Sequence, residues 1–322
     1  MKEFGVIDMH CDTITKLVYE KKDIRENDGH ISLNKMQKGN YMMQCFAIFL
    51  YLKAYPHPFA SCDSYIDDFY RFMQENSDVI KPVTTADEIE ENWEKGLMSG
   101  MLTIEEGGAL EGNLANLQHF YDRGVRMMTL TWNFENELAY PNYMDKSGMR
   151  PDTERGLKPL GIECVRKMQQ LGMIVDVSHL NDAGIYDVFR LATRPIVASH
   201  SNARAVCNVP RNLTDDMLRK LKENGGITGI NYCPDFISEK TDENQIPMIV
   251  RHINHIVSVA GVETVGLGSD FDGIPTPNGM SDCTRTHLLY EALKQEGYSQ
   301  QDIDLMFHGN FLRVLRANQV RS

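Results

Sequence analysis

The sequence lacks the features of membrane and nucleic-acid-binding proteins. None of its apolar runs approaches the roughly 18 residues that a membrane-spanning helix requires. It opens on a strand-like segment, without the basic region and apolar stretch of a secretion signal. Lys and Arg number 33 against 45 Asp and Glu, a formal net charge of -12. This balance argues against nucleic acid or an anionic membrane as a partner.

Paired cysteine motifs are also missing. The seven cysteines stand singly, with no Cys-x-x-Cys pair among them. An odd number of isolated cysteines without a secretion signal is typical of free thiols in a reducing compartment. The sequence therefore predicts a cytoplasmic location.

Short apolar runs recur along the chain, and segments with helical periodicity lie between them. The predicted strands are residues 5–12, 42–51, 100–106, 126–132, 173–179, 195–200, 226–232 and 264–270. The predicted helices are residues 65–75, 86–95, 113–123, 159–171, 182–191, 215–223, 247–259, 281–295 and 300–317. Strands that are apolar throughout, such as residues 173–177, are typical of a parallel sheet covered on both faces.

This alternation predicts an α/β protein of one domain, residues 1–322, folded as a single (β/α)8 TIM-type barrel. A doubly wound open sheet is the alternative. It is disfavoured because the sequence has neither a Gly-x-Gly-x-x-Gly turn nor a P-loop.

Histidines and acidic residues stand where the predicted strands end. His10 and Asp12 close the first strand, His179 the fifth, His200 the sixth and Asp270 the eighth. Parallel strands of a barrel end at one rim, so we expect these side chains to converge there. Three imidazoles, Asp12 and a shared carboxylate suit two divalent ions. Zinc is the first choice, and manganese, iron or cobalt are alternatives.

Glu105 and Glu106 compete for the position of the shared carboxylate. Strand alternation sends them to opposite faces, and the two glycines after Glu106 give that end of the strand unusual freedom. We favour Glu106 as the bridging residue. Asp8 lies one layer deeper than His10, so we expect it to position a ligand rather than to bind metal.

Two further residues are candidates for catalysis or for substrate binding. Asp270 is either another ligand or the group that takes a proton from the attacking water and passes it to a leaving amine. Asp272 shares its strand parity but lies beyond the strand, and we rank it lower. Arg211 either grips a substrate carboxylate or pairs with an acidic neighbour on the surface.

Six motifs, which occur in the same order as in a known family, indicate a resemblance to that family. They are Asp8-Met9-His10-Cys11-Asp12-Thr13, Glu106-Gly107-Gly108, the run from Leu171 to His179, Ser199-His200-Ser201, Gly268-Ser269-Asp270-Phe271-Asp272-Gly273, and Gly309-Asn310-Phe311-Leu312-Arg313-Val314. From the first strand to the last helix, the chain resembles the membrane (renal) dipeptidase family of zinc peptidases, within the amidohydrolase-like barrels.

The resemblance implies a barrel that holds two zinc ions and hydrolyses dipeptides by a hydroxide shared between them, often with a D-residue at the carboxyl-terminal position. The implied ligands are His10 and Asp12 for one zinc, His179 and His200 for the other, and Glu106 between them. Asp270 would shuttle the proton, and Arg211 would hold the dipeptide's free carboxylate. A homodimer is a weaker implication.

The chain departs from the family pattern after the fourth predicted strand. Many animal members have a histidine there that contacts the substrate, whereas this sequence has Trp132. We consider Trp132 as an apolar wall of the substrate site and Asn133 or Asn136 as a replacement hydrogen-bond donor. The secretion signal and lipid anchor of animal members are absent, so no membrane partner is expected.

Two other functions stay open at this point. One is a different binuclear-metal amidohydrolase that acts on an amide, a lactone or a phosphoester. The other is a barrel that binds metal without catalysis.

Overall fold

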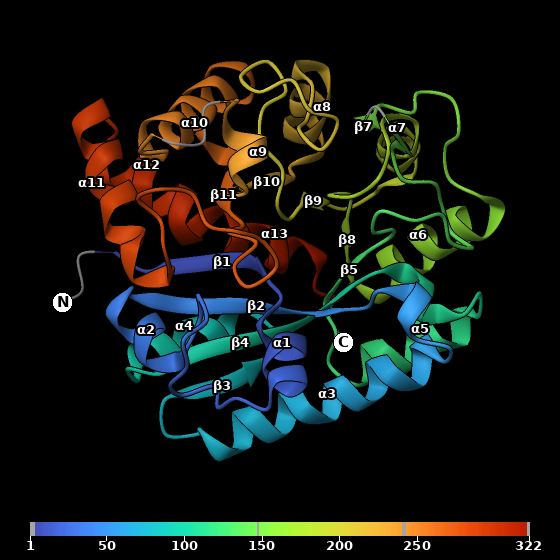
Figure 1. Ribbon diagram of the computed structural model, residues 1–322, viewed down its shortest axis with the longest axis horizontal. Coiled ribbons are helices and arrows are strands. Elements are labelled where there is room, and N and C mark those ends of the chain that lie inside the picture. Colours follow the sequence, from blue (N-terminus) through green and yellow to red (C-terminus); the bar gives the residue numbers. More distant parts are fainter. Residues whose placement is uncertain (1–3, 147, 240–242, 321–322) are drawn as a thin grey trace.

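Parallel strands close into a barrel that is ringed by helices (Figure 1). The computed structural model describes residues 4–146, 148–239 and 243–320. Around the barrel the strand order is β2-β1-β11-β10-β9-β8-β5-β4, and pairing of β4 with β2 completes the ring. The prediction of a (β/α)8 barrel is confirmed, and an open doubly wound sheet is excluded because the ring has no free edge.

Every predicted strand is present, although most are shorter than predicted. The barrel strands are β1 (Val6–Cys11), β2 (Tyr41–Phe49), β4 (Met98–Glu105), β5 (Met127–Thr129), β8 (Ile174–Asp176), β9 (Val197–Ala198), β10 (Ile227–Ile230) and β11 (Val265–Leu267). Three strands were not predicted. β3 (Ile80–Val83) pairs with the first half of β4, and β6 (Tyr143–Asp145) forms an antiparallel hairpin with β7 (Gly148–Arg150).

The helices cover the outside of the barrel and connect its strands. They are α1 (Thr13–Glu20), α2 (Leu33–Lys38), α3 (Pro58–Glu75), α4 (Ala86–Glu94), α5 (Leu114–Asp122), α6 (Pro159–Leu171), α7 (Asp182–Leu191), α8 (Asp215–Asn224), α9 (Pro234–Ile237), α10 (Ile246–Ala260), α11 (Thr286–Glu296), α12 (Gln300–Asp304) and α13 (Asn310–Asn318). Helices α1, α2 and α9 were not predicted. No helix in the described ranges combines the length and the apolar character needed to cross a lipid bilayer.

Buried side chains form two clusters. The larger one lies between the strands and the surrounding helices. The smaller one joins side chains from most barrel strands, such as Ile7, Met101 and Ile227, to α13. Side chains from so many strands can meet only inside the ring, so this cluster fills the barrel. Since Met101 faces the interior, alternation along β4 brings Glu105 to the same face.

Candidate metal centre

One glutamate lies between three histidines at the mouth of the barrel. The Oε1 atom of Glu105 is 2.9 Å from His179 Nε2 and 3.6 Å from His200 Nε2. Its Oε2 atom is 3.3 Å from His10 Nε2. All four side chains are buried. The two oxygens of a single carboxylate therefore face two different groups of imidazole nitrogens.

Hydrogen bonds behind the rings leave lone pairs on the nitrogens that point inward. The hydroxyl of Ser199 donates to Asp176 at 2.5 Å, so it accepts a hydrogen bond from His200 Nδ1 at 2.8 Å. The Nδ1 atom of His179 is 3.0 Å from the amide oxygen of Asn133, which only accepts. With both protons on Nδ1, the two Nε2 atoms face each other at 2.9 Å without a proton. A cation close to both nitrogens relieves their repulsion.

A second group of ligand atoms lies on the other side of His10. Its Nε2 atom is 3.8 Å from Asp12 Oδ1 and 4.0 Å from Asp270 Oδ1. Both His10 Nε2 and Asp12 Oδ1 are buried and have no hydrogen-bond partner among the described residues. Unpaired buried polar atoms are costly unless a ligand satisfies them.

Two sets of three residues therefore fit a metal ion in the described part of the chain. One is His10, Glu105 and His200, and the other is His10, Asp12 and Asp270; within each set the ligand atoms lie within 4.8 Å of one another. Imidazole nitrogens together with carboxylate oxygens are the donors that zinc and related divalent ions accept. The residues present thus fit a divalent-metal centre.

The prediction that Glu106 supplies the shared carboxylate is wrong. The backbone at Glu106 has φ of 116°, which turns its side chain away from the histidines. Its carboxylate instead accepts hydrogen bonds from Gly108 N at 2.8 Å, Trp132 N at 3.1 Å and Asn136 Nδ2 at 2.5 Å. Glu106 therefore anchors the loop after β5, and Glu105 takes the inward position. The sequence does not show which face of β4 points inward; the packing of Met101 inside the barrel, on the same face as Glu105, shows it.

Buried aspartates beneath the cluster hold the strand ends. Asp8 accepts hydrogen bonds from the backbone and hydroxyl of Ser269 at 2.9 and 2.6 Å, and from His10 N at 3.2 Å. This agrees with the expectation that Asp8 positions a ligand. Asp176 accepts from the backbone and hydroxyl of Ser199 at 2.8 and 2.5 Å. Sequence reasoning gave Asp176 no function, although an acidic residue inside an otherwise apolar strand is a signal for one.

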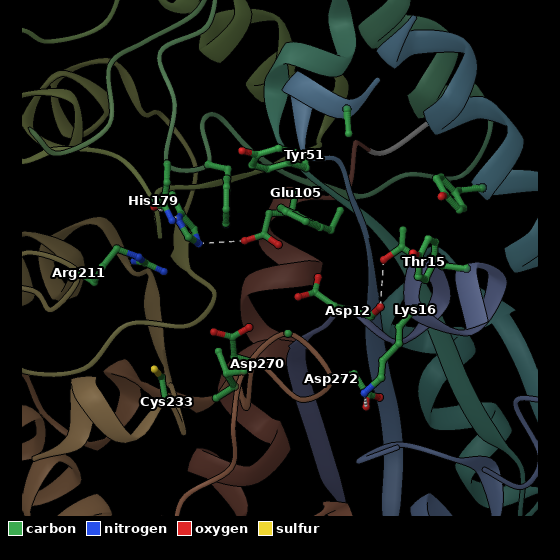
Figure 2. A pocket seen from close by; sticks show the side chains of 18 of the residues that line it. Asp12, Thr15, Lys16, Tyr51, Glu105, His179, Arg211, Cys233, Asp270 and Asp272 are labelled. Atoms are coloured by element: carbon green, nitrogen blue, oxygen red, sulfur yellow. Dashed lines mark hydrogen bonds and ion pairs between the residues drawn. The ribbon is translucent and has the colours of Figure 1, made fainter. Parts of the chain in front are cut away.

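A cavity of about 530 Å³ opens directly above the cluster. Figure 2 shows Glu105 and Asp12 near its centre, Arg211 beyond His179 on one side, and Lys16 on the opposite side. The size of this cavity and its position at the carboxyl ends of the strands are typical of a site that binds a small molecule.

Arg211 lines this cavity as a buried cation with spare donors. Its side chain belongs to a residue that is 4% exposed, and Nη1 donates to the Ser178 carbonyl. Nη2 is buried and has no hydrogen-bond partner among the described residues. The alternative of a surface ion pair is therefore excluded, because a buried guanidinium with a free donor is placed to receive an anion.

Comparisons with known proteins agree with this geometry. The family described as membrane dipeptidase, peptidase family M19, matches residues 1–322. The chain belongs to this family. An uncharacterized dipeptidase of Schizosaccharomyces pombe (strain 972 / ATCC 24843) is 33% identical over 91% of this chain and 73% of its own length.

Two solved structures are similar along the whole barrel. Dipeptidase AC, a metallo peptidase, superposes with a TM-score of 0.92 at 27% identity, covering 98% of this chain and 99% of the other. A metallo peptidase from Rhodobacter sphaeroides, bound to a phosphinate mimic of the dipeptide L-Ala-D-Ala, gives 0.89 at 27% identity with the same coverage. As a member of the family, this chain is a metal-dependent dipeptidase.

The departure from the family pattern at Trp132 lies in the cavity wall. The Trp132 ring is 5.0 Å from Phe49 and 6.2 Å from His179, measured between ring centroids. The Asn133 amide lines the cavity and is paired with His179. Asn136 is excluded as the replacement donor, because its amide is bound to Glu106 and to the Leu130 carbonyl.

The surroundings of each group shift its pKa. Burial lowers the pKa of His10, but the charges of Glu105, Asp12 and Asp270 outweigh burial and raise it to about 10. Burial and the charge of Arg211 lower the pKa of His179 to about 4. Burial raises the pKa of Asp270 to about 6. The cluster thus combines a histidine that favours its proton with one that does not.

Other predicted or rejected candidates lie outside the cluster. Asp272 accepts hydrogen bonds from Thr13 at 2.7 Å, Lys16 at 3.0 Å and His30 N at 2.8 Å, so it fixes the loop before α2 rather than a metal. His252 donates to the Ile237 carbonyl through Nε2 at 2.9 Å. These contacts are structural, and for Asp272 they agree with the low rank that the sequence gave it.

Proposed function

We propose that this chain hydrolyses dipeptides, including those with a carboxyl-terminal D-residue, with two zinc ions held at the barrel mouth. The proposed ligands are His10 and Asp12 for one ion, His179 and His200 for the other, and Glu105 between them. The observation that carries the proposal is the position of Glu105, whose two oxygens face His10 on one side and His179 and His200 on the other. When bound, such ions polarise a carbonyl and lower the pKa of a water molecule.

The residues of the cavity wall bind and orient the substrate. Arg211 Nη2, which is buried and has no hydrogen-bond partner in the described part of the chain, would receive the dipeptide's carboxylate. This contact would place over Glu105 the peptide bond next to the carboxylate, so that the carboxyl-terminal residue is the one released. The mimic of L-Ala-D-Ala bound by the Rhodobacter sphaeroides relative supports a dipeptide of this kind.

Asp270 would move the proton. Its Oδ2 atom is held by Asn231 Nδ2 at 3.0 Å, while Oδ1 faces the cluster. In the proposed reaction, Oδ1 takes a proton from the attacking water as the carbon–oxygen bond forms. The same atom then gives the proton to the amine nitrogen as the carbon–nitrogen bond breaks. The raised pKa of Asp270, about 6, suits a group that both accepts and donates near neutrality.

We further propose that residues 1–322 act as one domain in the cytoplasm. The seven cysteines are free thiols, which suits a reducing compartment. A homodimer remains a proposal that rests on the family resemblance.

Metal removal tests the proposed function. We expect dialysis against a chelator to abolish hydrolysis of L-Ala-D-Ala, and zinc to restore it with two ions bound per chain. Manganese and cobalt, added singly, show whether other ions substitute. Turnover that survives complete removal of metal, or a protein that takes up no ion at micromolar supply, would contradict the proposal.

A further inference from the structure

One wall of the cavity is built from aromatic rings. Phe49 is the last residue of β2, Tyr51 lies two residues further along the chain, and Trp132 comes from the loop after β5. Trp132 contacts both edge-on, with centroid distances of 5.0 Å to Phe49 and 5.9 Å to Tyr51. We call Phe49, Tyr51 and Trp132 the aromatic wall. None of the three is fully buried, so their surfaces are open to a ligand.

The aromatic wall is held from behind. Glu106 accepts a hydrogen bond from the Trp132 backbone at 3.1 Å, and Phe134 packs against Trp132 and Tyr51 at 5.5 Å from each. A wall fixed by a backbone hydrogen bond and by ring contacts keeps its shape when no ligand is bound. Preorganised apolar surface of this kind binds a side chain without a further ordering cost.

The part of the cavity across from Arg211 carries charged and hydroxyl side chains (Figure 2). Asp12, Thr15, Lys16 and Asp272 line it, and Lys16 is already paired with Asp272 at 3.0 Å. The Asp12 carboxylate suits a positively charged amine. Tyr19 and Ile274 also line this part, but Tyr19 is 85% exposed and has no ring contact with another aromatic side chain among the described residues, so no packed apolar wall forms here. If one residue carries both an ammonium group and an apolar side chain, the ammonium would therefore point toward Asp12 and the side chain toward the aromatic wall.

The position of Arg211 decides which residue of a dipeptide meets the aromatic wall. Figure 2 shows Arg211 on the far side of His179, and Tyr51 across Glu105 from Asp270. If the carboxylate is at Arg211 and the peptide carbonyl is over Glu105, the residue that lies beyond the cluster is the amino-terminal one. A dipeptide spans only about 7 Å, so its carboxyl-terminal residue stays beside Arg211.

We propose that this chain prefers dipeptides whose amino-terminal residue carries an aromatic side chain, which packs on the aromatic wall while the amine faces Asp12. Trp132 is then a specificity-determining residue. The inference rests on the proposed function, because it needs the carboxylate at Arg211 and the peptide bond at the metal centre.

Five substrates test the inference with the zinc-loaded enzyme: L-Ala-D-Ala, L-Phe-D-Ala, L-Ala-D-Phe, L-Phe-L-Ala and L-Ala-L-Ala. We expect kcat/KM for L-Phe-D-Ala to exceed that for L-Ala-D-Ala by about tenfold or more, from edge-on ring contacts and buried area. L-Ala-D-Phe, which carries the ring on the other residue, should gain less than L-Phe-D-Ala. L-Phe-L-Ala should exceed L-Ala-L-Ala by a similar factor.

Variants of the aromatic wall test whether its residues cause the substrate preference. Trp132→Ala should lower kcat/KM for L-Phe-D-Ala about tenfold more than it lowers kcat/KM for L-Ala-D-Ala, while Trp132→Phe keeps most of the preference. Tyr51→Ala should weaken it in the same direction. Tyr186→Ala is the matched control, because Tyr186 is an aromatic residue of α7 that does not line this cavity. Melting temperatures confirm that each variant is folded.

The outcomes separate the two proposals. Equal turnover of L-Phe-D-Ala and L-Ala-D-Ala, a larger gain for L-Ala-D-Phe, or an equal loss of both substrates in Trp132→Ala would overturn the inference alone. No zinc-dependent turnover of any dipeptide would overturn the proposed function and the inference with it.

Discussion

The metal centre has two halves that are built alike but differ in charge. In one half, Asp8 on β1 binds Ser269 after β11, below His10. In the other half, Asp176 on β8 binds Ser199 after β9, below His200. Each aspartate accepts both the backbone N–H and the hydroxyl of its serine. We call these the β1–β11 half and the β8–β9 half.

The two halves differ in what surrounds the imidazole. His10 has Asp12, Glu105 and Asp270 within 4.0 Å, and its pKa is raised to about 10 despite burial. His179 lies in the β8–β9 half, where Glu105 is near but Arg211 is too, and burial leads the lowering of its pKa to about 4. The pKa values of two histidines in the same barrel are therefore shifted in opposite directions. Burial and neighbouring charges, not the residue type, set the direction of each pKa shift.

A second difference concerns the connection to the ring. Ser199 links Asp176 to the Nδ1 atom of His200, which fixes the tautomer of that ring. Ser269 contacts the backbone carbonyl of His10 at 3.3 Å and no ring nitrogen. The β8–β9 half thus controls a proton on a ligand, whereas the β1–β11 half controls only the position of the strand.

The strongest test of the comparison removes the residue that the two halves share. We expect Glu105→Gln to lower kcat/KM by more than about 100-fold, the upper end of what loss of an outer-shell partner costs, and to reduce the metal content. Glu106→Gln is the control. It should keep its metal, because Glu106 faces Trp132 and Asn136, and lose about 1–3 kcal/mol of stability through the mismatched donor. Metal loss in Glu106→Gln but not in Glu105→Gln would reverse the assignment.

A smaller effect should distinguish the halves from each other. Asp176→Asn weakens the acceptor of Ser199, so the tautomer of His200 is less well held, and we expect metal affinity to fall about 10-fold to 100-fold. Asp8→Asn should lower the melting temperature with a smaller change in affinity. Competition with a chelator of known affinity measures the first quantity, and thermal unfolding the second. Equal losses of affinity would mean that the serine contact to His200 has no special importance.

The smallest effect comes from a buried imidazole outside the centre. His252 accepts from Ala203 N and donates to Ile237 O, and burial lowers its pKa to about 4. The unfolded chain, with a pKa near 6.5, binds the proton first. The contribution of His252 to the free energy of unfolding is therefore fully present above about pH 6.5. It decreases by about 1.4 kcal/mol per pH unit as the pH falls toward 4.

His252→Gln, which does not titrate, checks this expectation against the wild type. Melting temperatures of both proteins between pH 7 and pH 5 should converge as the pH falls, because only the wild type carries the His252 contribution. Loss of metal at low pH affects both equally. Parallel curves would show that burial alone does not depress an imidazole in this fold.

Local sequence patterns were sufficient for much of the site. The alternation of apolar runs and helical segments predicted the parallel barrel. The order of its strands follows because strands joined by short connections lie side by side. His10, Asp12, His179, His200 and Asp270 meet as expected, because each stands at a strand end and those ends share one rim. Arg211 was placed near the cavity, but its burial was not evident from its loop.

The tertiary structure alone decided between the adjacent glutamates. Their side chains leave a strand end in opposite directions, and the sequence around them is compatible with either choice. Contacts with Trp132 and Asn136, distant in the chain, bind Glu106 and leave Glu105 to the histidines. The aromatic wall has the same origin, since β2 and the loop after β5 meet only in the folded barrel. Residue types and strand ends are properties of the chain, but which side chain reaches the site depends on packing between segments that the sequence keeps apart.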